Sequence, residues 1–205
     1  AENGIPHEVC GKLVVATQES ELPLLQDLMS RGQRNGLKGL RWLNQIEIKE
    51  IEPHATGMAA LLVPEEGIVD YSMVCSKLVT KIQELGGRVL TGAKALAFKL
   101  DRADWVTETE AGEVRTHAIV NCAGLHSDRV AMMTGERTRL RIVPFRGQYY
   151  KLRENRSSLI RNLIYPVPNP AFPFLGVHFT RQITGGIEAG PNASLAFARE
   201  GYDKS

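Results

Sequence analysis

The chain has 205 residues, of which 43% are hydrophobic and 23% are charged, and its formal net charge is +2. This balance allows a buried core and differs from the composition of disordered chains. The near-neutral charge argues against a nucleic-acid-binding protein, and no apolar run approaches the ~20 residues that span a bilayer. The three cysteines form no Cys-x-x-Cys pair and have no metal-ligand spacing, so we expect buried free thiols, a reducing compartment and no metal site.

The first 90 residues alternate between strand and helix patterns. An apolar strand is expected at residues 12–16, followed by a helix that Ser20 caps and Gly32 ends. This helix carries an apolar face, formed by Leu22, Leu25, Leu28 and Met29. Residues 35–53 fit a helix and a strand equally well. The clearest helix pattern follows Asp70 and stops at Gly86–Gly87.

The second half changes from mixed patterns to strands. A strand is expected at residues 88–98, a hairpin at 105–109 and 113–116, a buried strand at 118–122 and a helix at 127–133. After Arg139 only strand patterns follow, at residues 142–152, 163–167, 174–183 and 187–189. The change predicts a domain boundary near residue 140.

The segment Ala118–Asp128 is the most informative part of the sequence. Its unbroken apolar run predicts a strand buried on both faces, as in a parallel sheet. The run ends in Asn121-Cys-Ala-Gly124, where small residues allow a ligand to approach the backbone. The helix start at Ser127-Asp128 directs backbone N–H groups toward the same place. This geometry suits a nucleotide cofactor, although the same corner also occurs as plain architecture.

The same segment resembles the "VVNCAG" element of the D-amino-acid-oxidase-like flavoenzymes. Five further stretches resemble, within that family, the L-2-hydroxyglutarate oxidases/dehydrogenases: Cys10–Thr17, Val143–Tyr150, Pro173–Thr180, Gly190–Ala193 and Arg199–Tyr202. The resemblance extends over essentially the whole chain. It implies a mixed α/β fold, with part of a Rossmann-like FAD-binding domain interleaved with a mostly antiparallel substrate domain.

The resemblance also implies a domain division and a set of cofactor contacts. Residues 58–139 are expected in the FAD-binding domain, and residues 1–57 and 140–205 in the substrate domain. The backbone around Ala95 is expected at the adenine end of FAD. The remaining contacts are expected in one turn, at Ala123, Gly124, Leu125 and Ser127.

The family's Gly-x-Gly-x-x-Gly turn, which holds the FAD pyrophosphate, is missing from this sequence. The nearest run, Gly185–Gly190, has the wrong spacing. We therefore interpret the chain as an internal piece of a longer parent enzyme. We expect the piece to be inactive by itself and to bind no FAD.

By resemblance, the parent oxidises L-2-hydroxyglutarate to 2-oxoglutarate by hydride transfer to the flavin. The substrate's carboxylates need cations, and arginine binds a carboxylate through two parallel hydrogen bonds. Strand alternation puts Arg146, Gln148 and Tyr150 on one face, which predicts either a pocket or a half-exposed strand. Arg146 and Tyr150 are our first candidates for binding the substrate.

His178 is the candidate catalytic base. Alternation puts it on one face with Phe174, Gly176 and Thr180, and an unperturbed imidazole titrates near pH ~6.5. A histidine in an apolar strand can equally be a satisfied core residue. His126, directly after the cofactor turn, is the next candidate.

Three further side chains are candidates for substrate contacts. Thr180 shares the face of His178, Tyr165 lies in the proline-rich segment 165–170, and Asn192 lies in a loop that resembles one near the family's active site. The open alternatives are the end of an edge strand for Tyr165 and an ordinary turn for Asn192.

The expected partner is a small dicarboxylate, without nucleic acid and without an obligate protein partner. The expected location is the cytoplasm, and a peripheral contact with the inner membrane or an electron acceptor stays open for the parent. Two alternative functions also remain open. One is a related FAD-dependent amine or 2-hydroxy-acid oxidase, and the other is a non-catalytic binding domain on the same scaffold.

Overall fold

The computed structural model describes residues 2–201 and divides into two compact units. The first unit contains the chain up to Leu78 together with Gly147–Ala193, and the second contains Val79–Arg146 and the chain from Ser194 onward. Each unit is therefore built from two separate stretches of sequence. The domain division at residues 57 and 139 stays a prediction.

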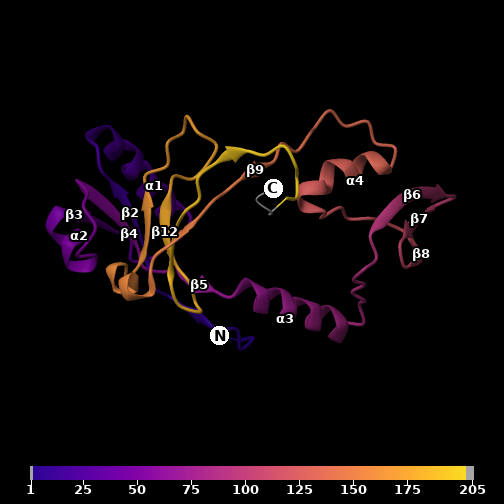
Figure 1. Cartoon of the computed structure of the whole chain (residues 1–205), viewed down its shortest axis with the longest axis horizontal. Coiled ribbons are helices and arrows are strands. Elements are labelled where there is room, and N and C mark those ends of the chain that lie inside the picture. Colours follow the sequence, from indigo (N-terminus) through magenta and orange to yellow (C-terminus); the bar gives the residue numbers. More distant parts are fainter. Residues whose placement is uncertain (1, 202–205) are drawn as a thin grey trace. The chain divides into compact units, whose positions relative to one another are not determined.

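The first unit is organised around a seven-stranded sheet with strand order β10-β13-β12-β11-β2-β4-β3 (Figure 1). Its strands are β2 (Lys12–Ala16), β3 (Arg41–Asn44), β4 (Ala59–Val63), β10 (Tyr150–Lys151), β11 (Leu163–Pro166), β12 (His178–Arg181) and β13 (Ile187–Gly190). Neighbouring strands are antiparallel except β2 and β11, which run parallel. The mostly antiparallel sheet predicted from the sequence is confirmed.

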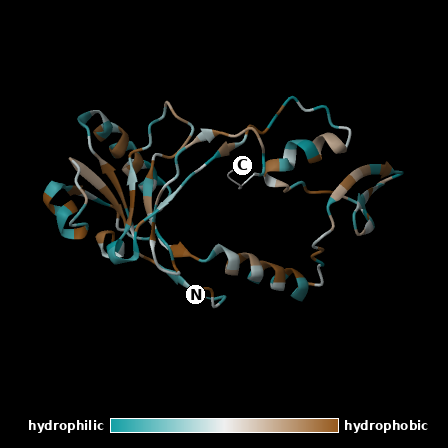
Figure 2. Ribbon diagram, in the orientation of Figure 1, coloured by the Kyte–Doolittle hydropathy of each residue, from teal (hydrophilic) through white to brown (hydrophobic). Residues whose placement is uncertain are grey.

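Two helices cover opposite faces of the β2–β4–β3 end of this sheet. Successive residues of β2 point to opposite faces, so Val14 and Ala16 join the cluster of α1 (Leu22–Arg34), whereas Leu13 and Val15 join that of α2 (Gln45–Ile51). Leu25 of α1 and Ile48 of α2 are fully buried. Figure 2 shows the hydrophobic strands between the two helices. The core of the first unit lies at this end of the sheet.

The remaining elements of the first unit are short. They are β1 (His7–Glu8), η1 (Glu19–Glu21), β5 (Ile68–Val69) and η3 (Glu154–Leu159). β1 pairs antiparallel with β5. Helix α3 (Tyr71–Glu84) begins in the first unit and ends in the second. Its start is fixed by Asp70, whose Oδ1 accepts the backbone N–H of Ser72 at 2.8 Å. The helix predicted after Asp70 is confirmed.

The predicted ends of α1 are wrong. Ser20 lies inside η1 and does not cap the helix, whose N-cap residue is Glu21. The carboxylate of Glu21 accepts the backbone N–H groups of Thr17 and Gln18. The helix also continues past Gly32 to Arg34. The glycine with a left-handed backbone conformation after the helix is Gly36, with φ +82°. Gly32 therefore lies inside the helix.

The ambiguous residues 35–53 form a strand followed by a helix. Asn44 ends β3 and caps α2, since its Oδ1 accepts the N–H groups of Ile46 and Glu47. The carboxylate of Glu47 accepts the N–H of Asn44 in return, which completes a capping box. Both patterns that fit this stretch therefore occur, one after the other.

The second unit contains a three-stranded antiparallel meander, a short helix and a two-stranded ribbon. Its elements are β6 (Ala95–Asp101), β7 (Asp104–Thr109), β8 (Gly112–Thr116), η2 (Gly124–His126), α4 (Ser127–Met133), β9 (Phe145–Arg146) and β14 (Ser194–Leu195). The hairpin and the helix at 127–133 are confirmed. The strand expected at 88–98 begins only at Ala95 and extends to Asp101.

The buried strand predicted at residues 118–122 is wrong. These residues form no strand, and the side chain of Val120 is 85% exposed. A strand needs a neighbour for its backbone N–H and C=O groups, and residues 118–122 pair with none of the strands described between residues 2 and 201. The apolar run therefore lacks the partner that would bury it.

Two long strands predicted after residue 140 are also shorter than expected. The stretch 142–152 contains only β9 and β10, with a break at residues 147–149. The stretch 174–183 contains only β12, so the predicted alternation from Phe174 to Val177 is wrong. The breaks coincide with Gly147 and Gly176, where an added Cβ would lie 2.8 Å from Pro191 and 2.6 Å from Pro166. Close packing against prolines, which donate no backbone N–H, replaces strand pairing there.

Candidate functional site

Three of the predicted site residues lie together on one face of the first unit's sheet. Ile164 of β11 pairs with Phe179 of β12, so the next residues outward, Tyr165 and His178, share the opposite face. Thr180 lies on that face too, opposite Glu188 of β13. This is the face that α1 covers further along the sheet, since Tyr165 packs against the α1 cluster. We call Tyr165, His178, Thr180 and Glu188 the polar sheet face.

The imidazole of His178 has a fixed plane and a fixed tautomer. Its ring stacks on that of Tyr165, with 4.0 Å between the centroids and 14° between the planes. Its Nδ1 lies 2.9 Å from the carbonyl oxygen of Gly176. Because a carbonyl oxygen only accepts hydrogen bonds, Nδ1 carries a proton, and in the neutral ring Nε2 is the nitrogen with the free lone pair. Nε2 is therefore the atom that can accept a proton from a bound molecule.

A lysine that the sequence reasoning missed completes this cluster. Nζ of Lys12 lies 5.3 Å from the centroid of the Tyr165 ring and 2.5 Å from Oε1 of Glu66. Its side chain is 22% exposed. The signal in the sequence was a single cation at the start of an otherwise apolar strand. Lys12 thus places an ammonium group, already paired with Glu66, beside the ring of Tyr165.

A cavity of about 320 Å³ includes part of the polar sheet face. Tyr165 and Thr180 line it, together with Glu66, Tyr71 and Arg181 among others. This volume is at the lower end of the range for small-molecule sites. Two predicted substrate residues therefore line one cavity of suitable size.

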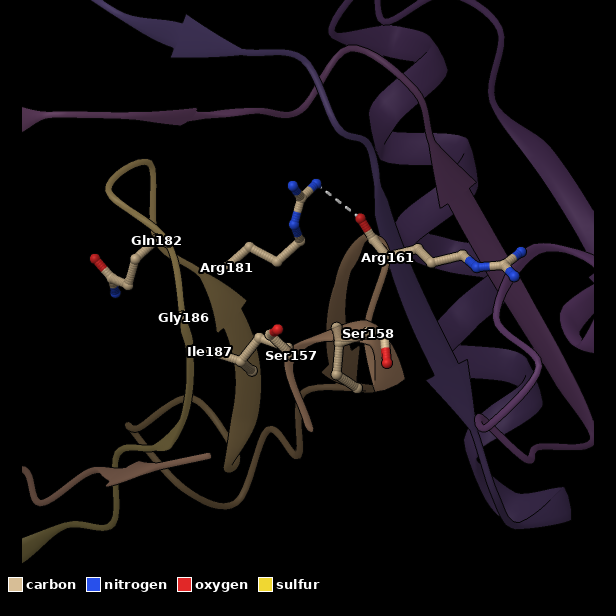
Figure 3. Close-up of a pocket in the computed structure, with 9 residues that line it drawn as sticks. Ser157, Ser158, Arg161, Arg181, Gln182, Gly186 and Ile187 are labelled. Atoms are coloured by element: carbon tan, nitrogen blue, oxygen red, sulfur yellow. Dashed lines mark hydrogen bonds between the residues drawn. The ribbon is translucent and has the colours of Figure 1, made fainter. Parts of the chain in front are cut away.

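A larger cavity of the first unit, about 640 Å³, is a weaker candidate for an anionic ligand. Two arginines, Arg161 and Arg181, line this cavity (Figure 3). The guanidinium of Arg181 donates to the carbonyl oxygen of Arg161 at 2.9 Å and to both carboxylate oxygens of Glu8, at 2.7 and 3.1 Å. The side chain of Arg161 points away from Arg181 in Figure 3. Glu8 thus already neutralises the charge that would attract a carboxylate.

The other predicted substrate residues do not lie on the polar sheet face. Tyr150 pairs with Ala189, which pairs with Phe179, so Tyr150 lies on the opposite face of the sheet and is 80% exposed. Three hydrogen bonds tie Asn192 to Gln148. Its side chain accepts the backbone N–H of Gln148 at 2.8 Å and donates to the Oε1 of Gln148 at 3.1 Å, and its backbone N–H donates to the carbonyl oxygen of Gln148 at 3.2 Å. Arg146 belongs to the second unit, where it pairs with Ser194.

The predicted cofactor turn is held by its own side chains. Asn121 donates through Nδ2 to the carbonyl oxygen of Ser127 at 2.8 Å, and its Oδ1 accepts the backbone N–H of Ala123 at 3.2 Å. Oγ of Ser127 donates to the carbonyl oxygen of Gly124 at 2.8 Å. Gly124 has φ +52°, and open space surrounds the position of an added Cβ. Exposed glycine backbone without a side chain fits a ligand that approaches closely, as FAD would.

The other predicted cofactor residues belong to the same unit. Leu125 lies in η2, directly after Gly124, and its side chain is 41% exposed. Ala95 opens β6 and pairs with Thr109 of β7.

An ion pair that the sequence reasoning missed braces this turn. Arg199 donates to both carboxylate oxygens of Asp128, and the Nη2–Oδ2 distance is 2.6 Å. It also donates to the carbonyl oxygens of Leu125 and Ile142. The hydrogen bonds from Arg199, followed by that from the N–H of Ile142, hold the pKa of Asp128 well below its usual range. Asp128 therefore stays ionised at any physiological pH.

The expected burial of the cysteines is wrong, since Cys75 and Cys122 are exposed and Cys10 is half-buried. Within residues 2–201, no three His, Cys, Asp or Glu side chains are grouped so that they could hold a metal ion. In the same range, none of the helices combines the length and the apolar character needed to cross a membrane.

Comparisons with known proteins identify the family. The family model described as FAD dependent oxidoreductase matches residues 1–204. L-2-hydroxyglutarate dehydrogenase of Indibacter alkaliphilus is 51% identical over 205 residues, which are 100% of this chain and 51% of that protein. The mitochondrial L-2-hydroxyglutarate dehydrogenase of Homo sapiens is 42% identical, over 98% of this chain and 46% of its own.

Solved structures show the same fold. L-proline dehydrogenase from P. horikoshii matches 98% of this chain and 53% of its own, with a TM-score of 0.83 and 20% identity. L-α-glycerophosphate oxidase from Mycoplasma pneumoniae, solved with FAD bound, matches 96% of this chain and 52% of its own, with a TM-score of 0.84 and 20% identity. The chain spans about half the length of the curated relatives that it matches. It belongs to the FAD dependent oxidoreductase family.

Proposed function

We propose that the protein containing this chain oxidises L-2-hydroxyglutarate to 2-oxoglutarate and uses FAD as its cofactor. The observation that carries the proposal is 51% identity over all 205 residues to a protein named L-2-hydroxyglutarate dehydrogenase. The activity is assigned to the protein at full length, because the chain spans about half of that relative.

His178 is the proposed base. In this reaction FAD, when bound, supplies the acceptor for the hydride. Nε2 of His178 takes the proton of the substrate's hydroxyl group, because Nδ1 already donates to the carbonyl oxygen of Gly176. The stacked ring of Tyr165 keeps the imidazole from rotating during this transfer.

The dicarboxylate is bound by groups of several kinds. Arg146 holds one carboxylate through the planar fork of its guanidinium. The hydroxyl groups of Tyr165 and Thr180 donate to the substrate from the wall of the 320 Å³ cavity. Tyr150 and Asn192 remain proposed contacts from the sequence, although Asn192 is already bonded to Gln148.

The flavin is proposed to contact the second unit. Its adenine end lies at the backbone of Ala95, and the turn of Ala123, Gly124, Leu125 and Ser127 approaches the cofactor closely. The positive φ and open surroundings of Gly124 support this placement. The cytoplasmic location and a peripheral contact with a membrane or an electron acceptor stay predictions.

A related amine oxidase is the second candidate, and the fold likeness to L-proline dehydrogenase favours it. An amine substrate would need a carboxylate partner or an aromatic cage for its cation. The two carboxylates on and beside the polar sheet face are already engaged: Glu66 pairs with Lys12 at 2.5 Å, and Oε2 of Glu188 accepts a hydrogen bond from Gln182 at 3.0 Å. These engaged carboxylates make the amine substrate the second candidate.

The test uses the full-length protein purified from a heterologous host. We expect a yellow protein with flavin absorbance near ~450 nm that reduces an artificial acceptor with L-2-hydroxyglutarate. The D-isomer, L-proline and glycine serve as matched controls and should give little turnover. A colourless protein, or one that turns over L-proline faster than L-2-hydroxyglutarate, would overturn the proposal.

A further inference from the structure

Residues 194–200 of the second unit connect two candidate site elements. Ser194 and Leu195 pair antiparallel with Arg146 and Phe145, and the N–H of Ala196 donates to the carbonyl oxygen of Pro144 at 3.0 Å. A few residues later the same segment reaches the cofactor turn through Arg199 and Glu200. One short stretch thus contacts both the proposed carboxylate-binding strand and the proposed cofactor turn.

We propose that residues 194–200 form a strap that fixes the cofactor turn relative to Arg146, with Arg199 as the main positioning residue. The inference rests on the proposed function, since it takes the turn at residues 123–127 as a flavin contact. It adds a role that the sequence did not predict for Arg199, Glu200 and Asp128.

The contacts of Arg199 identify it as a positioning group and not a ligand-binding one. Nη1 donates to the carbonyl oxygen of Leu125 and to Oδ1 of Asp128, while Nη2 donates to Oδ2 of Asp128 and the carbonyl oxygen of Ile142. Four of the five N–H donors of a guanidinium are thereby used. Little capacity remains for a phosphate or carboxylate of a ligand, so Arg199 acts through the backbone that it holds.

The backbone held by Arg199 is the part of the turn that needs support. Gly124 has the conformational freedom of a residue without a side chain, and its φ of +52° lies in a region that other residues rarely adopt. The next carbonyl group, that of Leu125, is fixed by Arg199. A cofactor contact displaced by about 1 Å can cost on the order of 10²-fold in rate.

A second contact, one residue further on, supports the same turn from another side. Oε1 of Glu200 lies 3.0 Å from Nε2 of His126, which is the last residue of η2. The two pairs differ in burial. The side chains of Arg199 and Asp128 are 13% and 5% exposed, whereas those of His126 and Glu200 are 38% and 69% exposed. We expect Arg199 to contribute most of the positioning and Glu200 a smaller part.

The test compares four variants of the full-length protein. Arg199→Met removes all four hydrogen bonds, and Arg199→Lys keeps the charge near Asp128 but cannot reach both carbonyl groups. Glu200→Gln weakens the exposed pair with little effect on folding. Arg115→Met is the matched control, since it removes the pairs with Asp101 and Asp104 on the meander, where the side chains of Arg115 and Asp101 are more than half exposed.

Three quantities are measured for each variant: the dissociation constant of FAD from the apoprotein, the visible circular dichroism of the bound flavin and KM for L-2-hydroxyglutarate. In Arg199→Met we expect FAD binding weakened by about tenfold or more, an altered flavin band and a higher KM. Arg199→Lys should bind FAD more tightly than Arg199→Met but less tightly than the wild type. Glu200→Gln should lose a few-fold in FAD affinity at most, and Arg115→Met should match the wild type in all three quantities.

A merely structural role for Arg199 gives a different result. The melting temperatures of apoprotein and holoprotein would then fall together, with FAD affinity, flavin band and KM unchanged, and the strap proposal would be wrong. If Arg199→Met does not fold, wild-type values of all three quantities in Arg199→Lys and Glu200→Gln overturn it. A wild-type protein that binds FAD but does not oxidise L-2-hydroxyglutarate overturns the proposed function alone, and one that binds no FAD overturns both.

Discussion

The phenol ring of Tyr165 stacks on the imidazole of His178, with centroids 4.0 Å apart and planes inclined by 14°. The two residues come from adjacent antiparallel strands, β11 and β12, so the sheet itself sets their spacing. With Nδ1 directed at the carbonyl oxygen of Gly176, the imidazole is held both in its plane and in its tautomer. This arrangement supports the following predictions for the full-length protein.

Replacing His178 by alanine should lower kcat by about 10²–10⁴-fold, because the base that accepts the hydroxyl proton is lost. The acidic limb of the kcat profile against pH should disappear in the variant. Steady-state rates with L-2-hydroxyglutarate and an artificial acceptor, taken between pH 5 and 9, measure both effects. Turnover close to that of the wild type would show that the proton goes elsewhere, with His126 the next residue to test.

Replacing Arg146 by lysine should act on binding more than on turnover. Lysine keeps the charge but loses the planar fork, so binding of the carboxylate should weaken by roughly 1–3 kcal/mol. KM should then rise with a smaller change in kcat. Arg102→Lys, at the exposed turn between β6 and β7, is a control that should leave KM unchanged. An unchanged KM in Arg146→Lys would place the carboxylate on another cation, with Lys12 the first alternative.

Replacing Tyr165 separates the stacked ring from the hydroxyl group. Tyr165→Phe keeps the stack and should retain kcat, with KM raised by the loss of one donor. Tyr165→Leu removes the ring and should lower kcat further, by an amount corresponding to about 0.5–1.5 kcal/mol for an aromatic pair. The comparison of kcat between the two variants is the measurement. Equal kcat values would mean that the stack does not orient His178.

Replacing Asp128 by asparagine should change the pH dependence of stability in a defined direction. The pKa of Asp128 is lowered in the folded protein, mainly by the hydrogen bonds from Arg199. A carboxyl group with a lowered pKa stabilises the folded protein fully at pH values above its pKa in the unfolded chain, near ~3.9. This stabilisation is lost as the pH falls below that value. Urea unfolding should therefore show Asp128→Asn clearly less stable than the wild type at pH 7. The gap should narrow below about pH 4; a gap that stays constant down to acid pH would contradict this assignment.

Two isoleucines of α2 give a matched test of the core. Ile48 is fully buried between α2 and the sheet, whereas Ile46, on the same helix, is 72% exposed. Ile48→Ala should cost about 2–5 kcal/mol of unfolding free energy, and Ile46→Ala should stay within about 0.5 kcal/mol of the wild type. Urea titrations of both variants measure these losses of unfolding free energy. Similar losses at the two positions would mean that α2 packs differently from the structure described here.

The sequence predicted well the elements whose signals are local. The helix after Asp70 and the strand at residues 12–16 form where expected, because a cap and an apolar period act within a few residues. Ser20 failed as a cap because it lies inside the 3-10 turn η1, so that the N-cap position of α1 falls on Glu21. Residue types alone do not specify whether such a turn precedes a helix.

The predictions that were wrong concern elements whose burial depends on residues far away in the sequence. The apolar run at residues 118–122 has the composition of a buried strand, yet burial requires a pairing strand that composition does not reveal. The same limit applies to the site. Alternation put Thr180 on the face of His178, and the structure agrees, whereas Lys12 and Asp128 acquire their surroundings only through the tertiary fold. Long-range contacts of this kind leave no periodic trace in the sequence.

The parallel pairing of β2 with β11 has a consequence for how the protein is made. Residues 12–16 can pair with residues 59–63 as soon as the latter have been synthesised. Their other edge must wait until residues 163–166 have been synthesised. During that interval the nascent chain presents the unpaired backbone of an apolar strand, which is a template for pairing with other chains. Translation speed between these two segments, and the chaperones that bind extended apolar peptides, should therefore govern the yield of folded protein.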